Sequence, residues 1–197
     1  MGGSFDPLHI GHLIVAQDAV EYLGLSEVVF IPAAIPPHKQ HLQRIDSEHR
    51  LKMLRLAVES NPKFSVSDVE VQRGGVSYTI DTLKTLHKVY PDAALLLIVG
   101  SDTLVDLHTW HKVEEILELC EVATFLRPGE DSLEAIAEKI PLPEKQKQPL
   151  LQNVIDAHRI EISSSEIRRR LTEGLDIRYL VPPEVETYIN EHSLYQS

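Results

Sequence analysis

The sequence has little cysteine and no long apolar run, so it offers few means of cross-linking the chain or of anchoring it in a membrane. Cys120 is the one cysteine, which excludes an intramolecular disulfide framework and a zinc site built from several cysteines. It lies in an apolar run and is interpreted as a thiol of the core. No apolar stretch reaches the roughly 18 residues of a transmembrane helix, and no signal-peptide pattern opens the chain. We therefore expect a cytoplasmic protein.

Basic residues are also scarce. The 19 lysines and arginines face 30 aspartates and glutamates, which gives a formal net charge of −11. A broad positive surface for duplex nucleic acid or for an anionic membrane is therefore not expected, whereas a small anionic ligand needs only a local positive pocket. With 197 residues, 43% of them hydrophobic, the chain is predicted to form a single domain over residues 1–197. The sequence indicates no particular oligomeric state.

Short apolar runs alternate with amphipathic stretches along the chain. Helices are predicted at 10–23, about 46–60, from 79, about 112–119, from 164 and after 183. Strands are predicted at 28–31, 64–71, 95–99, 122–126, 154–155 and 159–162. This alternation predicts an α/β fold with a parallel sheet flanked by helices, in which ligands lie outside the carboxyl ends of the strands. Residues 139–152, rich in proline, are expected to form an exposed connection, and residues from about 163 to 197 a small C-terminal helical part.

The first candidate site is the string G-G-S-F-D-P-L-H-I-G-H at residues 2–12. Glycines let the backbone approach a bulky anion, and a helix that begins near His9 offers unpaired amides and a partial positive charge. His9 and His12 are three residues apart, so both imidazoles can face one ligand. Alone, the pair would suit a structural or surface role, or a metal pair for which no third ligand stands at convincing spacing. The whole string favours phosphate binding.

The second candidate site is I-S-S-S-E-I-R at residues 162–168. Serines that open a helix can cap it, and their hydroxyl and amide groups can hold a phosphate. Arg168 falls one turn into that helix and can point back at the same anion. The alternative is an ordinary capped helix with a solvated basic face, to which Arg169 and Arg170 would belong.

Three weaker signals lie between these motifs. Pro36-Pro37-His38-Lys39 is a stiff loop that offers a cation, although such a lysine is usually a surface residue. Gly100-Ser101-Asp102 follows the most apolar strand, where the carboxylate can accept ribose hydroxyls or cap a helix. Trp110 stands among polar neighbours, where its ring can stack on an aromatic base or anchor the core.

Taken together, these motifs resemble the nucleotidyltransferase superfamily with the H-x-G-H signature, and within it the bacterial nicotinate-nucleotide adenylyltransferases. The resemblance covers nearly the whole chain. Its landmarks are residues 2–12, P-P-H-K (36–39), S-Y-T (77–79), G-S-D (100–102), T-W (109–110) and 162–168. It implies a Rossmann-like fold and transfer of AMP from ATP to nicotinate mononucleotide, with release of pyrophosphate. Mg²⁺ would be held mainly through the ATP phosphates, since no dedicated carboxylate cage is visible.

The resemblance also implies roles for individual residues. The catalytic residues would be His9, His12 and Arg168. ATP would be bound by Gly3, Ser4, Phe5, His9, Gly11, His12, Gly100, Asp102, Ser163, Ser164 and Arg168. Nicotinate mononucleotide would be bound by His38, Lys39, Thr79, Trp110 and His111, with Thr79 and Trp110 acting largely through backbone amides and ring stacking.

The sequence departs from the family at its start, because the family has a hydrophobic strand before G-G-x-F-D-P and here only Met1 precedes Gly2. We expect either that the natural start lies upstream or that the sheet has a gap. H-I-G-H also marks class I aminoacyl-tRNA synthetases, but no K-M-S-K-S string is present. Other H-x-G-H adenylyltransferases, nicotinamide mononucleotide as the substrate, and a catalytically silent nucleotide-binding module are the remaining alternatives.

Overall fold

The computed structural model describes residues 1–37, 45–126 and 133–196. The contacts between residues divide the chain into two compact units. The first unit joins Met1–Val76 to Glu161–Ser197, and the second is Ser77–Ile160. The prediction of a single domain over residues 1–197 stays a prediction. Both units are of the expected α/β class, with parallel strands flanked by helices.

A three-stranded parallel sheet forms the centre of the first unit. Its strands are β1 (Gly2–Gly3), β2 (Val28–Pro32) and β3 (Phe64–Val66), in the order β1-β2-β3. The β-branched and aromatic run of β2 is almost entirely buried, as suits a central strand. The short strand β1 pairs Gly3 with Pro32. The sequence predicted that the family's hydrophobic first strand would be missing, and a strand of only two residues forms directly before the loop that follows.

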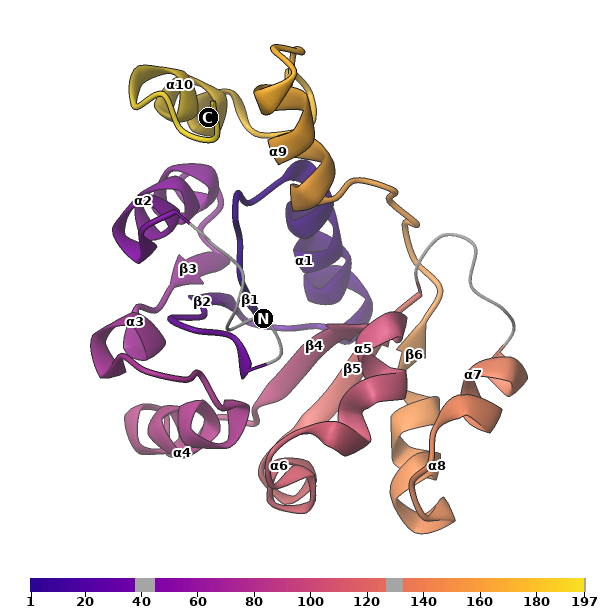
Figure 1. Cartoon of the computed structure of the whole chain (residues 1–197). Coiled ribbons are helices and arrows are strands. Elements are labelled where there is room, and N and C mark those ends of the chain that lie inside the picture. Colours follow the sequence, from indigo (N-terminus) through magenta and orange to yellow (C-terminus); the bar gives the residue numbers. More distant parts are fainter. Residues whose placement is uncertain (38–44, 127–132, 197) are drawn as a thin grey trace. The chain divides into compact units, whose positions relative to one another are not determined.

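In the described residues, the helices of the first unit are α1 (Ile10–Leu23), α2 (Ser47–Val58), α3 (Val69–Arg73), α9 (Ser164–Thr172) and α10 (Pro183–Glu191) (Figure 1). Helix α1 ends at Gly24, whose φ of 63° is the left-handed conformation that glycine adopts without penalty. Asp46 caps α2 by accepting a hydrogen bond from the Glu48 amide at 2.9 Å. The end of α1 and the start of α2 agree with the ranges predicted from the sequence.

The second unit has its own parallel sheet, in the order β4-β5-β6. The strands are β4 (Leu96–Gly100), β5 (Glu121–Phe125) and β6 (Val154–Ile155). The helices are α4 (Thr79–Val89), α5 (Ser101–Asp106), a 3-10 turn (Leu107–Thr109), α6 (Val113–Leu119), α7 (Leu133–Lys139) and α8 (Glu144–Gln152). Two hydrophobic clusters hold these elements together, one around Leu104 and Val122 and one around Ile80 and Ile116.

Three sequence predictions about these elements are wrong. The strand expected at 64–71 ends at Val66, and α3 begins at Val69 because helix packing prevails over the β-propensity of the valines. Residues 144–152 of the expected exposed connection form α8 despite Pro149, since Leu150 is buried against the core. No strand forms at 159–162, where the chain passes from the second unit back to the first.

None of the helices in the described residues has the length and hydrophobicity that crossing a membrane requires.

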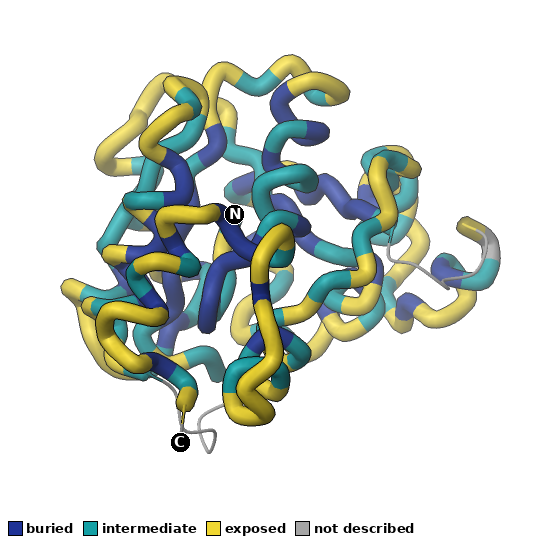
Figure 2. The backbone as a smooth tube through the Cα atoms, turned by 90° about the horizontal axis from the view of Figure 1, so that it is seen from above, coloured by how far each residue is buried: buried dark blue, intermediate teal, exposed yellow. Residues whose placement is uncertain are grey.

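The loop after β1 is strongly buried. Residues 5–9 are all buried, and in Figure 2 dark blue marks such segments of the backbone.

The thiol of Cys120 is a core group, as predicted. It is 9% exposed, packs in the cluster around Ile80 and Ile116, and donates to the Ile116 carbonyl at 3.4 Å. Burial raises the pKa of this thiol to about 11, so hardly any thiolate exists at neutral pH. We expect the folded protein to react very slowly with a thiol reagent such as Ellman's reagent, and the unfolded protein to react at the rate of a free cysteine. Fast reaction of the folded protein would contradict this placement.

Candidate active site

The loop from Gly3 to His9 is shaped by the side chain of Phe5. This ring is 2% exposed and packs edge-on against Phe30 at 5.8 Å and His12 at 5.0 Å between centroids. A Cβ atom on Gly3 would lie 3.0 Å from the Phe5 ring. Gly3 is therefore needed for packing, a reason other than the close approach of an anion expected from the sequence. Because the Phe5 ring faces the core, only the backbone of Phe5 can contact a ligand.

The two histidines meet at the start of α1, as predicted. His9 is the N-cap residue and is 5% exposed, whereas His12 is half-buried. Their ring centroids are 3.7 Å apart, and the His9 amide donates to Nδ1 of His12 at 3.2 Å. Since Nδ1 of His12 accepts this bond, the neutral ring carries its proton on Nε2. The His12 imidazole is thus held in the tautomer that can donate a hydrogen bond from Nε2.

Several amides at the start of α1 already have acceptors within the protein. The Ile10 amide donates to the Leu180 carbonyl at 2.9 Å, and the His12 amide donates to the His9 carbonyl at 3.0 Å. The sequence predicted that such amides would bind an anion together with the two imidazoles. Because these amides are already hydrogen-bonded within the protein, they can contribute less to phosphate binding. Side-chain donors must therefore supply more of the positive charge that stabilises a bound phosphate.

The serine-arginine motif lies directly against this loop, as the sequence analysis required (Figure 1). Ser163 caps α9 by accepting from the Glu166 amide at 3.1 Å. The Ser164 hydroxyl donates to the Pro7 carbonyl at 2.8 Å, and Nη1 of Arg168 donates to the Asp6 carbonyl at 2.7 Å. Two direct bonds therefore join motifs that lie more than 150 residues apart in the sequence.

These contacts separate the roles of the serines and arginines. The Ser163 hydroxyl accepts a hydrogen bond from the Glu166 amide and still has its own proton to donate. The Ser164 hydroxyl already donates its proton to the Pro7 carbonyl. Arg168 points at the loop instead of belonging to a solvated face. Arg169 does lie on such a face, where it pairs with Glu166 at 2.7 Å and with Glu173. Hydrogen bonding to Arg169 also lowers the pKa of the Glu166 carboxyl.

Three residues that the sequence analysis did not single out complete this arrangement. The Asp6 carboxylate is 4% exposed and accepts a hydrogen bond from the Tyr195 hydroxyl at 2.7 Å. Arg50 is 2% exposed, and its Nη1 donates to the carbonyls of Ser4 and Ala33, each at 2.8 Å. Arg50 stands at helical spacing from Met53, Leu54 and Ala57, so the apolar face of α2 was a signal for its burial. No local pattern points to Tyr195.

Among the predicted site residues of the second unit, Gly100 and Asp102 lie at the start of α5 and Thr79 lies at the start of α4. Gly100 ends β4 and is the N-cap of α5, and Asp102 is exposed in the first turn of that helix. The alternative in which Asp102 itself caps the helix is therefore wrong. Thr79 is the first residue of α4, and the neighbouring Tyr78 ring lies 4.7 Å from that of His111.

Trp110 is half-buried and packs against both hydrophobic clusters of the second unit. Its amide donates to the Leu107 carbonyl at 3.0 Å, so the backbone role implied by the family is already taken at this residue. The Trp110 ring therefore contributes to the hydrophobic core of the second unit. His38 and Lys39 lie outside the described residues.

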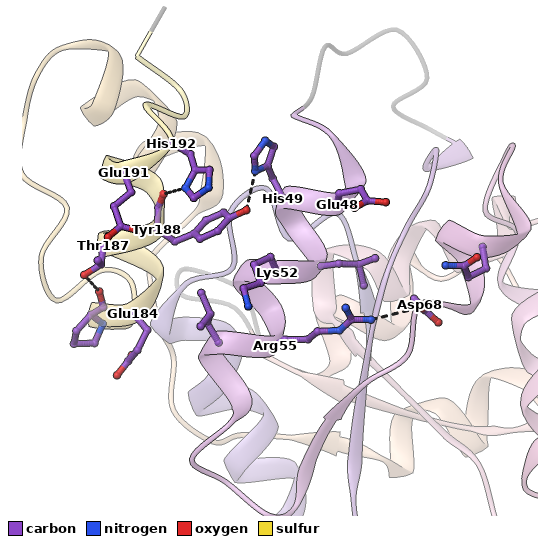
Figure 3. Close-up of a pocket in the computed structure, with 14 residues that line it drawn as sticks. Glu48, His49, Lys52, Arg55, Asp68, Glu184, Thr187, Tyr188, Glu191 and His192 are labelled. Atoms are coloured by element: carbon purple, nitrogen blue, oxygen red, sulfur yellow. Dashed lines mark hydrogen bonds and ion pairs between the residues drawn. The ribbon is translucent and has the colours of Figure 1, made fainter.

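The described residues contain no group of three or more histidine, cysteine, aspartate or glutamate side chains that could hold a metal ion. A groove of about 1020 Å³ lies elsewhere in the first unit, between α2 and α10 (Figure 3). Its lining includes His49, Tyr188 and His192, and none of the predicted site residues that the structure describes.

Comparison with known proteins identifies the family. A family model described as cytidylyltransferase-like matches residues 1–170. The chain belongs to the cytidylyltransferase-like family, among the nicotinate-nucleotide adenylyltransferases. A Thermomicrobium roseum protein named "Probable nicotinate-nucleotide adenylyltransferase" is 45% identical over 100% of this chain and 90% of its own length. A Herpetosiphon aurantiacus protein of the same name is 46% identical over 99% of this chain and 96% of its own length.

The fold of this family member is also similar to that of solved structures. The structure of Plasmodium falciparum nicotinic acid mononucleotide adenylyltransferase complexed with NaAD superposes with a TM-score of 0.77 at 23% identity, covering 98% of this chain and 94% of that one. At this identity the likeness supports the Rossmann-like α/β fold predicted from the sequence.

Proposed function

We propose that this protein transfers AMP from ATP to nicotinate mononucleotide, giving deamido-NAD and pyrophosphate, a step of NAD biosynthesis. The observation that carries the proposal is the direct attachment of Arg168 and Ser164 to the loop of His9 and His12. Full-length identity of 45% to a protein named for this activity supports the choice of substrates. A cytosolic location stays a prediction.

The chemistry needs positioning and charge stabilisation more than a base. An oxygen of the mononucleotide phosphate attacks the α-phosphorus of ATP, a new P–O bond forms, and the bond to the β-phosphate oxygen breaks with pyrophosphate as the leaving group. The attacking phosphate is already ionised at neutral pH. Negative charge grows on the oxygens around the α-phosphorus and on the leaving group, where fixed donors are most effective.

The residues of the first unit fit these demands. We assign the Nε2–H of His12 to the phosphate oxygens that gain charge, with His9 holding it in register through the hydrogen bond from its amide. Arg168 is assigned to the leaving pyrophosphate, and its side chain is 36% exposed, so a ligand can reach it. The roles proposed for Gly3, Ser4, Gly11 and Ser163 are hydrogen bonding to, or room for, the same triphosphate.

Mg²⁺ is proposed to enter with ATP as its phosphate complex. The donor set in the described residues does not form a cage for the ion, so no step is assigned to protein-held metal. In the second unit, Gly100 and Asp102 are proposed to bind adenosine or ribose, and Thr79, Trp110 and His111 the nicotinate part. His38 and Lys39 are likewise proposed to bind nicotinate mononucleotide.

The test is release of pyrophosphate from ATP and Mg²⁺ with nicotinate mononucleotide, in parallel with nicotinamide mononucleotide and with no acceptor. We expect turnover with nicotinate mononucleotide to exceed that with the amide. Faster turnover with the amide would change the substrate assignment to the rival adenylyltransferase. Nucleotide binding without pyrophosphate release from any acceptor would support a silent nucleotide-binding module.

Replacement of Trp110 tests the assignment of the nicotinate part. The Trp110→Ala variant is expected to raise the KM for nicotinate mononucleotide more than the KM for ATP, because the ring would stack on the nicotinate. Because Trp110 also packs against both clusters, the variant should melt at a lower temperature. Steady-state kinetics with each substrate varied in turn would check this. Equal effects on both constants would mean that the ring serves the core alone.

A further inference from the structure

A residue from the far end of the sequence reaches the loop that carries the histidine pair. The Tyr195 hydroxyl donates to Oδ1 of Asp6 at 2.7 Å across 189 residues of sequence. The Asp6 carboxylate is 4% exposed, so it has little access to water and depends on donors from the protein. A hydrogen bond to a buried carboxylate is among the stronger kinds, and it fixes the orientation of that side chain.

Asp6 is also the residue to which Arg168 is attached. Nη1 of Arg168 donates to the Asp6 carbonyl at 2.7 Å and lies 3.9 Å from Oδ2 of the Asp6 carboxylate. Nη2 donates to the Ser165 hydroxyl at 3.3 Å. Asp6 thus contacts Tyr195 through one carboxylate oxygen and faces Arg168 with the other. A change in the rotamer of Asp6 would alter the position of the guanidinium.

Tyr195 is suited to act as a permanent donor. Burial raises the pKa of its hydroxyl and the nearby Asp6 carboxylate raises it further, although Arg168 and Arg50 act in the opposite direction. The hydroxyl therefore stays protonated across the working pH range. The backbone at Tyr195 is left-handed, with φ of 63°, a conformation that non-glycine residues keep only where surrounding contacts enforce it. Buried Leu194 provides such an anchor next to it.

We propose that Tyr195 is a positioning residue for the transfer reaction, which sets the guanidinium of Arg168 for the leaving pyrophosphate by holding the carboxylate of Asp6. The inference rests on the function proposed above. It assigns no contact between Tyr195 and the substrates. Its effect should accordingly appear in the constants that involve ATP and pyrophosphate, and not in those of the mononucleotide.

The test compares Tyr195→Phe with Tyr188→Phe. The first change removes only the hydroxyl that reaches Asp6. The second removes a hydroxyl of the same C-terminal segment that bonds Nδ1 of His49 at 2.9 Å, in the groove of Figure 3. We expect Tyr195→Phe to lower kcat/KM for ATP about tenfold and to weaken binding of inorganic pyrophosphate by a similar factor, the scale of one hydrogen bond to a charged group. Tyr188→Phe should leave both unchanged.

Two further readouts separate positioning from a structural role. The KM for nicotinate mononucleotide should stay within about twofold of wild type, since Tyr195 is given no contact with the substrates and Arg168 is assigned to the pyrophosphate. In combination with Asp6→Ala, which removes the acceptor of the Tyr195 hydroxyl, the effect of Tyr195→Phe on pyrophosphate binding should largely disappear, because the two residues act as one unit. Additive effects, or equal losses for both substrates, would overturn the proposal.

Failure of the proposed function would look different. If wild type and Tyr188→Phe both released no pyrophosphate with any acceptor, the proposed reaction would be wrong. Binding of inorganic pyrophosphate, followed by calorimetry, would then still decide the role of Tyr195. No binding by wild type, or equal binding by wild type and Tyr195→Phe, would overturn it.

Discussion

The His12→Ala variant should lose turnover by at least about 10²-fold, the loss typical when one donor to a charged transition state is removed. The reason is the hydrogen bond from the His9 amide to Nδ1 of His12, which places the ring proton on Nε2, the donor proposed for the reacting phosphates. Steady-state pyrophosphate release under saturating ATP would measure this loss. Near-normal turnover would reject the assigned role.

Loss of the ring could also disturb the start of α1, and a second variant separates the two effects. In His12→Asn the amide oxygen can still accept the His9 amide, but no imidazole donor remains. We expect this variant to melt close to wild type and to be as inactive as His12→Ala. His49→Ala, in the groove between α2 and α10, is the control histidine and should keep turnover within about twofold.

The Arg50→Met variant should show the largest loss of stability. In the wild type the Arg50 guanidinium is buried. Its removal leaves the carbonyls of Ser4 and Ala33 without the hydrogen bonds that it donates to them, each of 2.8 Å. Stranded buried acceptors cost about 1–3 kcal/mol each, so we expect a loss of roughly 2–5 kcal/mol. Chemical denaturation followed by circular dichroism would measure it.

Arg55→Met is the matched control on the same helix. The Arg55 side chain is 56% exposed and meets Asp68 at 3.4 Å. Exposed ion pairs of this kind contribute about 0–1 kcal/mol, so the control should unfold close to wild type. A loss for Arg50→Met no larger than that for Arg55→Met would show that the buried guanidinium does not hold the loop.

The sequence predicted those parts of the site that depend on local pattern. The glycines and histidines of residues 2–12 and the serine cap at Ser163 have fixed spacing, and the structure places them as expected. Helix α1 and strand β2 were equally plain from apolar periodicity. Strand predictions failed at 67–71 and 159–162, where packing and neighbouring strands, and not propensity, decide the structure.

Tyr195 and Arg50 could not be recognised in the same way, for a physical reason. Their importance comes from the atoms they reach, Oδ1 of Asp6 and the carbonyls of Ser4 and Ala33, which are distant in sequence. A tyrosine near the end of a chain and an arginine in an amphipathic helix are ordinary in isolation. The occupied amides of Ile10 and Trp110 were likewise invisible before the acceptors Leu180 and Leu107 were located.

The first unit is assembled from Met1–Val76 and Glu161–Ser197, with the whole second unit between them in sequence. During synthesis the histidine loop therefore emerges long before the residues that hold it, since Ser164 is made 157 residues after its partner Pro7. The intervening segment has its own sheet and core and can fold in the meantime. A nascent chain should consequently gain affinity for nucleotide only late in translation.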